Sequence, residues 1–237
     1  MNLIDIKKQQ RYSFCSIKII NHQKGHTVAR AIANDHHQKK ANILQQASTL
    51  FVAEGFSRIS MVQLAEACDI SKSNLYHYYR DKESILFSLL DSHMDEILSV
   101  LQQTANDYPS EQLKPLIMAL LALYRDADHK HRVLLNDLQV LPQAQQDIIR
   151  QKERRIVQFF KAAILSEYPD YLSRPQFLSA GAMTVLGAIN WSFTWFKPDK
   201  GLTVADYADF IANIFRSGLP HVNDLTNPQP SQPLETP

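Results

Sequence analysis

The chain has 237 residues, 45% of them apolar, which allows one large domain or a small domain joined to a larger one. Its six scattered glycines exclude the Gly-rich phosphate loops of Rossmann and P-loop proteins, and its two cysteines exclude a disulfide framework. The net charge of +1 conceals an asymmetry, because residues 1–82 hold 12 Lys and Arg against 6 Asp and Glu, whereas residues 83–237 hold 13 against 18. This asymmetry predicts that the N-terminal part binds a polyanion, unless the charge belongs to a solvated basic arm.

Residues 1–35 show no stable hydrophobic period and carry six Lys and Arg. We predict a mobile basic extension, which either contacts phosphate groups or results from a start codon upstream of the true one. The chain does not begin with the unbroken apolar segment of a secretory signal. We therefore expect a cytoplasmic protein.

A helical pattern begins at His37 and stops at Gly55. Its period is 3.6 residues, and its apolar face consists of Ile43, Leu44, Ala47, Leu50 and Phe51. Ser60 with Gln63 then predicts a capping box at the start of a second helix of barely two turns.

A three-residue turn and a third helix follow. Asp69 is a tolerable left-handed residue in the turn, and Ser71 caps a helix that ends near Tyr78. Two short capped helices joined by such a turn are typical of a helix-turn-helix, whose second helix enters the major groove of DNA.

Helical patterns continue after this motif. A long fourth helix with a broad apolar stripe is expected from near Asp81 to Tyr108, followed by periods over residues 113–124, 133–141 and 143–166. Ser173 and Pro175 predict the start of a helix without charged residues that extends to Phe196. This segment reaches membrane-spanning length, but polar side chains recur through it, which favours a buried interface helix.

The last helix is expected to begin at Thr203 with Asp206 and to end near Gly218. The Pro-rich residues 220–237 have little that could pack, so we predict a disordered tail. No alternating strand pattern occurs, and the fold class is therefore predicted to be all-α.

The segment Ala41–Leu90 resembles the N-terminal domain of the tetracycline-repressor (TetR) family of bacterial transcription regulators. The resemblance is carried by Ala47, Leu50, Phe51 and Gly55-Phe56, by Ile70-Ser71-Lys72, and by Leu75-Tyr76-His77-Tyr78-Tyr79 followed by Lys82-Glu83. The chain differs at Asp69, where the family usually has Gly, and at Tyr79, where it often has Phe. Beyond residue 105 the resemblance weakens, as expected of a domain that varies with its ligand.

The resemblance implies that the third helix is a recognition helix for double-stranded operator DNA. The residues implied in DNA binding are Ser60, Met61, Ser71, Lys72, Ser73, Asn74, Tyr76, His77, Tyr78 and Lys82. Their chemistry agrees, because Lys binds phosphate or a guanine edge, Asn pairs with adenine, and Tyr hydroxyls donate to phosphate. Lys82 is expected to anchor a phosphate at the start of the fourth helix. Tyr76 and Tyr78 have the alternative role of packing between helices, while Leu75 and Tyr79 are expected in the core.

The resemblance also implies a homodimer formed through the last two helices, and a small-molecule effector. The run Ile189–Pro198 is similar to family members that sense acyl-coenzyme A or related catabolic intermediates. Expected ligand-binding residues are Tyr124, Phe159, Asn190, Trp191, Phe193 and Trp195, because ligand sites are mainly apolar with a few polar groups. Alternatives stay open for several of these residues. The two Trp residues could equally fill the dimer core, and Tyr124 and Phe159 could merely complete the apolar stripes of their helices. Arg154 and Arg155 either bind a phosphorylated ligand or lie on a solvated face.

No metal, cofactor or catalytic site is predicted. Asp126, Asp128, His129 and His131 are close in sequence, but a second ligand set is missing, so exposed loop residues are expected there. Motifs of serine hydrolases and zinc proteases are absent.

Together these patterns predict an all-α protein with an N-terminal three-helix helix-turn-helix domain (36–82) and a C-terminal helical ligand-binding and dimerisation domain (83–219). The function indicated is a DNA-binding transcriptional regulator, a repressor that its effector releases from a (pseudo)palindromic operator, with no enzyme activity and no membrane partner. Two alternatives stay open: a DNA-binding activator or architectural protein without a small-molecule ligand, and a helical-bundle enzyme.

Overall fold

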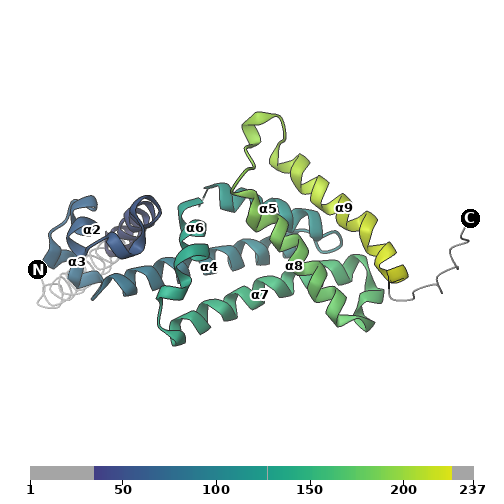
Figure 1. Cartoon of the computed structure of the whole chain (residues 1–237), viewed down its shortest axis with the longest axis horizontal. Coiled ribbons are helices and arrows are strands. Elements are labelled where there is room, and N and C mark those ends of the chain that lie inside the picture. Colours follow the sequence, from purple (N-terminus) through teal and green to yellow (C-terminus); the bar gives the residue numbers. More distant parts are fainter. Residues whose placement is uncertain (1–34, 127, 226–237) are drawn as a thin grey trace, which may run out of the picture. The chain divides into compact units, whose positions relative to one another are not determined.

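The computed structural model describes residues 35–126 and 128–225, and these are helical with short connections (Figure 1). The chain divides into two compact units, Met1–Lys82 and Glu83–Pro237, each of which has its own core. The predicted basic extension, apart from residue 35, and the tail from residue 226 onward lie outside the described residues. Within the described ranges no strand occurs, which confirms the all-α fold class.

The first unit contains a helix over residues 35–54, a 3-10 turn η1 (Phe56–Arg58), and the short helices α2 (Met61–Ala67) and α3 (Lys72–Tyr78). Gly55 ends the first helix with φ 87°, a backbone conformation that side chains rarely adopt. The core of this unit is formed by Ile43, Ala47, Phe51, Phe56, Ile59, Leu64, Ala65, Cys68, Leu75 and Tyr79. Three of its helices thus bury one apolar face each against the others.

The turn between α2 and α3 has the geometry of a Schellman motif. The amide of Asp69 donates to Glu66 O and the amide of Ile70 to Ala65 O, both at 3.0 Å. Asp69 itself has φ 53°, as the sequence predicts, and is the one non-glycine with positive φ in the described ranges. The left-handed position explains why glycine suits this site, and an Asp side chain tolerates it.

The described part of the second unit contains six helices with short 3-10 segments between them. Its helices are α4 (Lys82–Asp107), which begins one residue before the unit boundary, α5 (Leu113–Asp126), α6 (Asp128–Asp137), α7 (Gln143–Glu167), α8 (Pro175–Ser192) and α9 (Val204–Leu225). The 3-10 segments are η2 (Leu138–Val140), η3 (Pro169–Ser173) and η4 (Pro198–Lys200).

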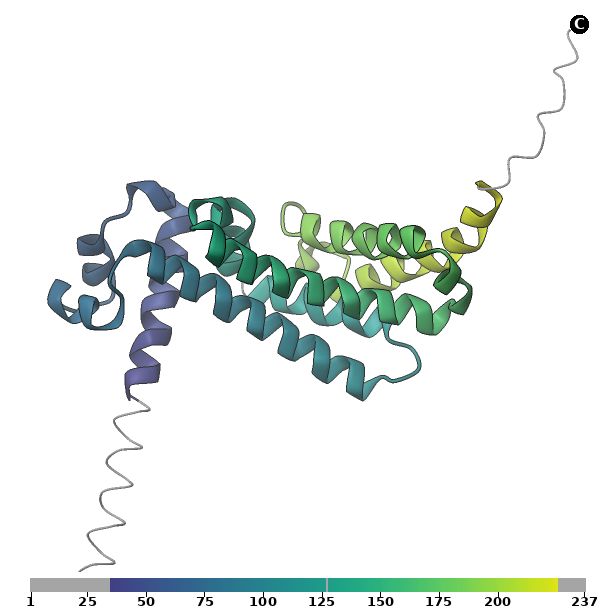
Figure 2. The ribbon, with the colours of Figure 1, turned by 90° about the horizontal axis from the view of Figure 1, so that it is seen from below.

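Helix α7 runs beside α8, and α5 packs along α9 (Figures 1 and 2). The α4 stripe is buried along its length, with Ile85, Leu86, Leu89, Leu90, His93, Met94, Ile97, Leu98 and Leu101 facing inward. Lys152 of α7 ties the two long helices together, because its Nζ lies 2.7 Å from the carboxylate of Asp95 and also bonds Asp91 on α4. The C-terminal unit is therefore a bundle with α5, α7 and α8 at its centre.

Three helix ends differ from the sequence prediction. Ser173 does not cap α8, because its hydroxyl donates to Asp170 O within η3, and Arg174 takes the N-cap position without a side-chain cap. Helix α8 ends at Ser192, and α9 continues past Gly218 to Leu225. Pro220 lies within this helix. A proline removes one backbone hydrogen bond, but its fixed φ is compatible with a helix, so its low helix propensity does not always end the helix. No helix in the ranges 35–126 and 128–225 is long and apolar enough to cross a membrane.

Candidate functional site

Helix α3 presents a polar face and buries an apolar one. Lys72, Ser73, Tyr76 and His77 are exposed, and Tyr76 shows 46% of its surface. Leu75 is fully buried, and Tyr79, just after the helix, is 6% exposed, which confirms their predicted place in the core. The exposed residues point away from the unit, and a large exposed tyrosine on a two-turn helix is suited to contact another molecule.

The N-termini of α2 and α3 are both capped by serine. The hydroxyl of Ser60 accepts from the Gln63 amide while the Gln63 side chain accepts from the Ser60 amide, so the predicted capping box is confirmed. The hydroxyl of Ser71 accepts from the Asn74 amide at 3.1 Å. Both serines are exposed, and Met61 and Asn74 are half-buried. The caps leave helix N-terminal N–H groups near the surface, where anions are favoured.

Two aromatic contacts modify the expected roles of the tyrosines. The Lys72 ammonium lies 5.9 Å from the ring centroid of Tyr76, so these exposed side chains form one cationic and aromatic pair. Tyr78 is half-buried, and its ring centroid lies 5.0 Å from that of His36 on the first helix. Packing between helices thus accounts for part of the Tyr78 surface, whereas Tyr76 stays 46% exposed.

Lys82 folds back onto the loop that precedes α2. Its Nζ donates to Phe56 O at 2.7 Å, to Ile59 O at 2.8 Å and, more weakly, to Ser57 O at 3.4 Å, and it lies 4.3 Å from the Phe56 ring centroid. An ammonium has three donors, and three carbonyls use them. A phosphate contact by Lys82, as the sequence predicts, would have to share or replace these bonds, and that prediction remains open.

The basic charge of the first unit lies mainly outside the described residues. Residues 35–82 contain six Lys and Arg against five Asp and Glu, whereas residues 1–34 contain six against one. Two of the described cations are also paired, Lys39 with Asp35 at 2.7 Å and Arg80 with Asp81 at 2.8 Å. The charge argument for a polyanion therefore rests on the N-terminal segment more than on the three helices themselves.

A cavity of about 210 Å³ opens in the second unit between α5, α6 and the end of α8. It is lined by Leu121, Tyr124, Arg125, Arg132, Ser192, Phe193, Phe196 and Pro198. Leu121, Tyr124 and Ser192 are buried at its base, and the guanidinium of Arg132 lies 5.6 Å from the ring centroid of Phe193. Apolar walls with a few polar groups are the usual composition of a small-molecule site.

The structure separates the six residues expected to bind a ligand. Tyr124 and Phe193 line this cavity. Phe159 is half-buried on α7, and Asn190 is half-buried on α8, with an Oδ1 that is buried without a hydrogen-bond partner among the described residues. Trp191 and Trp195 are 67% and 50% exposed and are not among the described lining residues.

A pair of buried histidines lies behind the cavity wall. The ring of His131 on α6 stacks on Tyr124 with centroids 3.6 Å apart, and it also meets Phe193 at 6.1 Å and His93 of α4 at 5.9 Å. His131 is 2% exposed, so the sequence expectation of an exposed loop is wrong at this residue. Burial lowers the pKa of His93 to about 4, and the positive charge of Lys130 adds to the effect. His93 falls at a core position of the α4 stripe, and that register is the one sequence signal that could have indicated it.

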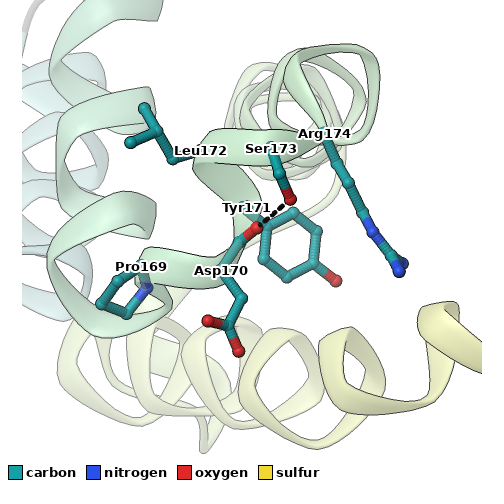
Figure 3. A pocket seen from close by; sticks show the side chains of 6 residues that line it. All are labelled: Pro169, Asp170, Tyr171, Leu172, Ser173 and Arg174. Atoms are coloured by element: carbon teal, nitrogen blue, oxygen red, sulfur yellow. Dashed lines mark hydrogen bonds between the residues drawn. The ribbon is translucent and has the colours of Figure 1, made fainter.

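A larger hollow of about 580 Å³ lies over η3 and is lined by Pro169, Asp170, Tyr171, Leu172, Ser173 and Arg174 (Figure 3). It is less suited to a ligand because one short segment forms it and only Tyr171 among its lining residues is buried. In Figure 3 the Asp170 carboxylate and the Arg174 guanidinium lie on either side of the Tyr171 ring, so the charged groups do not converge. Convergent polar groups from several elements are what distinguishes the smaller cavity.

The outer faces of α8 and α9 expose large apolar side chains. Met183 and Trp191 on α8 are 57% and 67% exposed, and Phe210 and Ile214 on α9 are 57% and 58% exposed. These four residues, which we call the apolar face, recur at helical spacing on each helix. Large apolar side chains gathered on adjacent helices mark a protein contact surface.

Two family models match the chain. The model described as bacterial regulatory proteins, tetR family, matches residues 43–89, and the model described as tetracyclin repressor-like, C-terminal domain, matches residues 106–219. Among curated proteins, the uncharacterized HTH-type transcriptional regulator YerO of Bacillus subtilis (strain 168) is 27% identical over 146 residues. That alignment covers 58% of this chain and 49% of YerO, and the chain spans about half the length of the curated relatives it matches.

Solved structures resemble the chain over a larger part of their length. A TetR-family transcriptional regulator from Bordetella parapertussis 12822 has 29% sequence identity and a TM-score of 0.69, covering 74% of this chain and 93% of that chain. The crystal structure of AibR in complex with isovaleryl coenzyme A and operator DNA has 27% identity and a TM-score of 0.65, covering 74% of this chain and 97% of that chain.

Proposed function

The chain belongs to the tetracycline-repressor family of bacterial regulatory proteins, and we propose that it is a cytoplasmic transcriptional repressor, not an enzyme, that a small effector releases from its operator. The observation that carries the proposal is the exposed face of α3, which presents Lys72, Tyr76 and His77 on a helix held by the buried Leu75. A capped helix packed on its apolar side and polar on the other is what a recognition helix requires.

The proposed DNA-binding residues divide by the group they meet. Lys72 and Tyr76 reach phosphate or a base edge as a pair, and Asn74 offers an amide that matches adenine. Ser60, Met61, Ser71 and Ser73 lie at the two helix N-termini, where hydroxyl and backbone N–H groups suit phosphate oxygens, and His77 and Tyr78 extend the same face.

We propose further that the chain forms an isologous homodimer through α8 and α9. The apolar face supports this, because Met183, Trp191, Phe210 and Ile214 are large, exposed apolar side chains of the kind that a second copy covers. Two recognition helices on a dimer would read two half-sites about one helical turn, or a small multiple of it, apart.

The proposed effector site is the cavity lined by Tyr124, Arg132 and Phe193. An acyl-coenzyme A is one candidate effector, supported by the likeness to AibR, whose crystal structure contains isovaleryl coenzyme A. The effector would weaken operator binding if it binds better to the conformation in which the DNA-binding units are splayed.

The first experiment is binding of the full chain to the DNA upstream of its own gene over a salt series, with the variants Lys72→Ala and Tyr76→Ala. We expect tight, sequence-preferring binding, a loss of about tenfold or more for each variant, and a salt slope lower by about one for Lys72→Ala. Lys197→Ala and Tyr108→Ala are matched controls, because these side chains are exposed in the second unit.

Equal weak binding to upstream and random DNA, with the same salt slope in every variant, would overturn the proposal. If the control variants lose as much DNA binding as the α3 variants, the loss is not specific to α3 and the DNA-binding site is not on this helix.

A further inference from the structure

Three aromatic rings line the cavity of about 210 Å³ in the second unit. They belong to Tyr124 of α5 and to Phe193 and Phe196, which follow the end of α8. Leu121 and Pro198 add apolar surface to the same wall. The described lining is therefore mainly aromatic and apolar, and its aromatic members come from two separate segments of the chain.

Each of the three rings packs against another ring of the protein. Tyr124 stacks on His131 with centroids 3.6 Å apart, and Phe193 lies edge-on to the same His131 at 6.1 Å. The Phe196 ring lies 4.8 Å from that of Tyr207. The cavity wall is thus held in place by its own neighbours, so a ligand would not have to order it.

A wall of this kind favours an aromatic ligand over an aliphatic one. Rings attract one another in offset-stacked or edge-to-face arrangements with centroids about 4.5–7 Å apart, and this attraction adds to the gain from apolar burial. Apolar cavities of about 150 Å³ hold benzene, whereas drug-sized ligands usually occupy about 300–1,000 Å³. A cavity of about 210 Å³ therefore suits one ring with a small substituent.

The hydroxyl groups of the lining offer one donor and one acceptor. Burial raises the pKa of Tyr124 well above its usual range, and the negative charge of Glu153 adds to the effect. The Tyr124 hydroxyl therefore stays protonated and keeps its capacity to donate. The Ser192 hydroxyl uses its proton in a bond to Ile189 O at 2.6 Å, so it can only accept from a ligand.

The two arginines of the lining give no reason to expect a charged ligand. Arg125 and Arg132 each interact already with other groups of the protein, and the guanidinium of Arg132 lies 5.6 Å from the ring centroid of Phe193. Removing a carboxylate from water into a mainly apolar cavity is costly. An uncharged molecule avoids that cost.

We propose that this cavity binds an uncharged, single-ring aromatic compound, whose ring lies against Phe193 and Phe196 and whose carbonyl substituent accepts a hydrogen bond from Tyr124. The role of this compound as the effector rests on the proposed function, whereas its binding does not.

The test is calorimetric titration of the full chain with benzamide and acetophenone, each compared with its saturated counterpart, cyclohexanecarboxamide and cyclohexyl methyl ketone. We expect at least one aromatic probe to bind about fivefold or more tightly than its counterpart, because the saturated ring loses the contacts between rings. Benzoate, which has the ring of benzamide with a negative charge, should bind more weakly than benzamide.

Two variants test the residues of the cavity. Tyr124→Phe keeps the ring and removes the hydroxyl, and it should weaken binding of the aromatic probe about fivefold or more. Phe193→Leu should reduce the preference for the aromatic probe over its saturated counterpart. Far-ultraviolet circular dichroism of each variant shows whether the helices are intact, and the comparison of probes on the parent protein does not depend on any variant.

Matched controls make the same changes outside the described lining. Tyr108→Phe is at an exposed site at the end of α4, and Phe177→Leu is at a half-buried site in the first turn of α8. Both controls should leave the affinity for the aromatic probe and the preference for it unchanged.

Several results would overturn the inference: aromatic and saturated probes that bind equally, dissociation constants above about 1 mM for both aromatic probes, benzoate that binds as tightly as benzamide, or equal losses in the Tyr124 variant and its control. Operator binding of the same variants without ligand is measured separately. Normal operator binding with no binding of the probes would refute the inference alone, whereas binding of a probe by a protein that ignores operator DNA would refute the proposed function alone.

Discussion

The Lys82 side chain joins the start of α4 to the loop before α2. Its three N–H donors meet the carbonyls of Phe56, Ser57 and Ile59, two of them at 2.8 Å or less. Loop carbonyls beside a buried Phe56 have few other donors, so the lysine fixes how the loop enters α2.

Replacing this lysine should weaken the first unit. We expect Lys82→Met to lower the free energy of unfolding by about 2 kcal/mol, because hydrogen bonds from a charged donor are lost and the carbonyls stay half-buried. Urea unfolding followed by circular dichroism at a fixed protein concentration measures it. Lys72→Met, at an exposed site, should change stability by less than about 0.5 kcal/mol, and equal effects of the two would contradict the structural role of Lys82.

His93 is a fully buried histidine among apolar residues of α4. Glu96 lies 3.9 Å from its Nδ1, but that carboxylate is 42% exposed and is paired with Lys130 at 3.1 Å, so it does little to favour a charged imidazole. Burial therefore dominates and lowers the pKa to about 4 from its ordinary 6.5.

The lowered pKa predicts a loss of stability in mild acid. Below pH 6.5 the unfolded chain takes up a proton that folded His93 refuses until about pH 4, so the contribution is complete above pH 6.5 and falls as the pH falls. We expect a loss of about 2 kcal/mol between pH 7 and pH 5 from this residue. Urea unfolding of His93→Leu at both pH values should show a smaller decrease than the parent protein, and His77→Leu, at an exposed site, should not.

At the scale of elements, the contact of α8 with α9 depends on a glycine. A Cβ added at Gly181 would lie 2.7 Å from Cζ of Phe215 and 3.6 Å from Cδ1 of Ile164. Real Cβ atoms do not approach that closely, and Phe215 is only 9% exposed, so its ring has little room to move.

We expect Gly181→Ala to lower the free energy of unfolding by about 1 kcal/mol, because overpacking outweighs the gain in helix propensity. The same change made in a Phe215→Leu background should cost less or become stabilising, since leucine has no ζ atom. A double-mutant cycle of urea unfolding energies measures the coupling. Additive effects would show that the two residues do not press on each other.

Most helices and their caps could be predicted from the sequence, and the features that could not be predicted have physical causes. The caps at Ser60 and Ser71 and the left-handed Asp69 follow from interactions within a few residues, which the sequence displays directly. The helix periods of α4 and α7 follow from their apolar stripes.

The cavity beside Tyr124 depends on contacts between distant segments, and here the sequence is less informative. Tyr124 and Phe193, which line the cavity, were expected to bind a ligand. Arg125 and Arg132 also line it but were not expected there, because a charged residue near a helix end is usually exposed to solvent. His131 reads as a loop residue and is buried only because α6 turns it onto Tyr124. The sequence predicts a phosphate contact for Lys82 and does not show that its ammonium donates to carbonyls of the loop before α2.

At the scale of the whole molecule, the two units expose different kinds of surface. The first unit buries its apolar residues and exposes a polar helix face, whereas the second unit leaves Met183, Trp191, Phe210 and Ile214 uncovered. A monomer that exposes four such side chains on two adjacent helices carries a cost that a second copy would remove. Operator affinity and self-association should therefore depend on each other, because a dimer engages two half-sites at once.

The apolar face predicts the effect of one charge placed within it. Ile214→Glu should convert the dimer to a monomer in sedimentation equilibrium, because the carboxylate of each copy would have to be buried against the other's apolar side chains. Ile148→Glu is the matched control, since Ile148 is also exposed, at 43%, but lies on α7, which is not one of the two helices of that face. The monomer should keep its helical circular dichroism and lose about two orders of magnitude in operator affinity, while the control keeps both properties. A dimeric Ile214→Glu protein, or an equal loss in the two variants, would place the interface elsewhere.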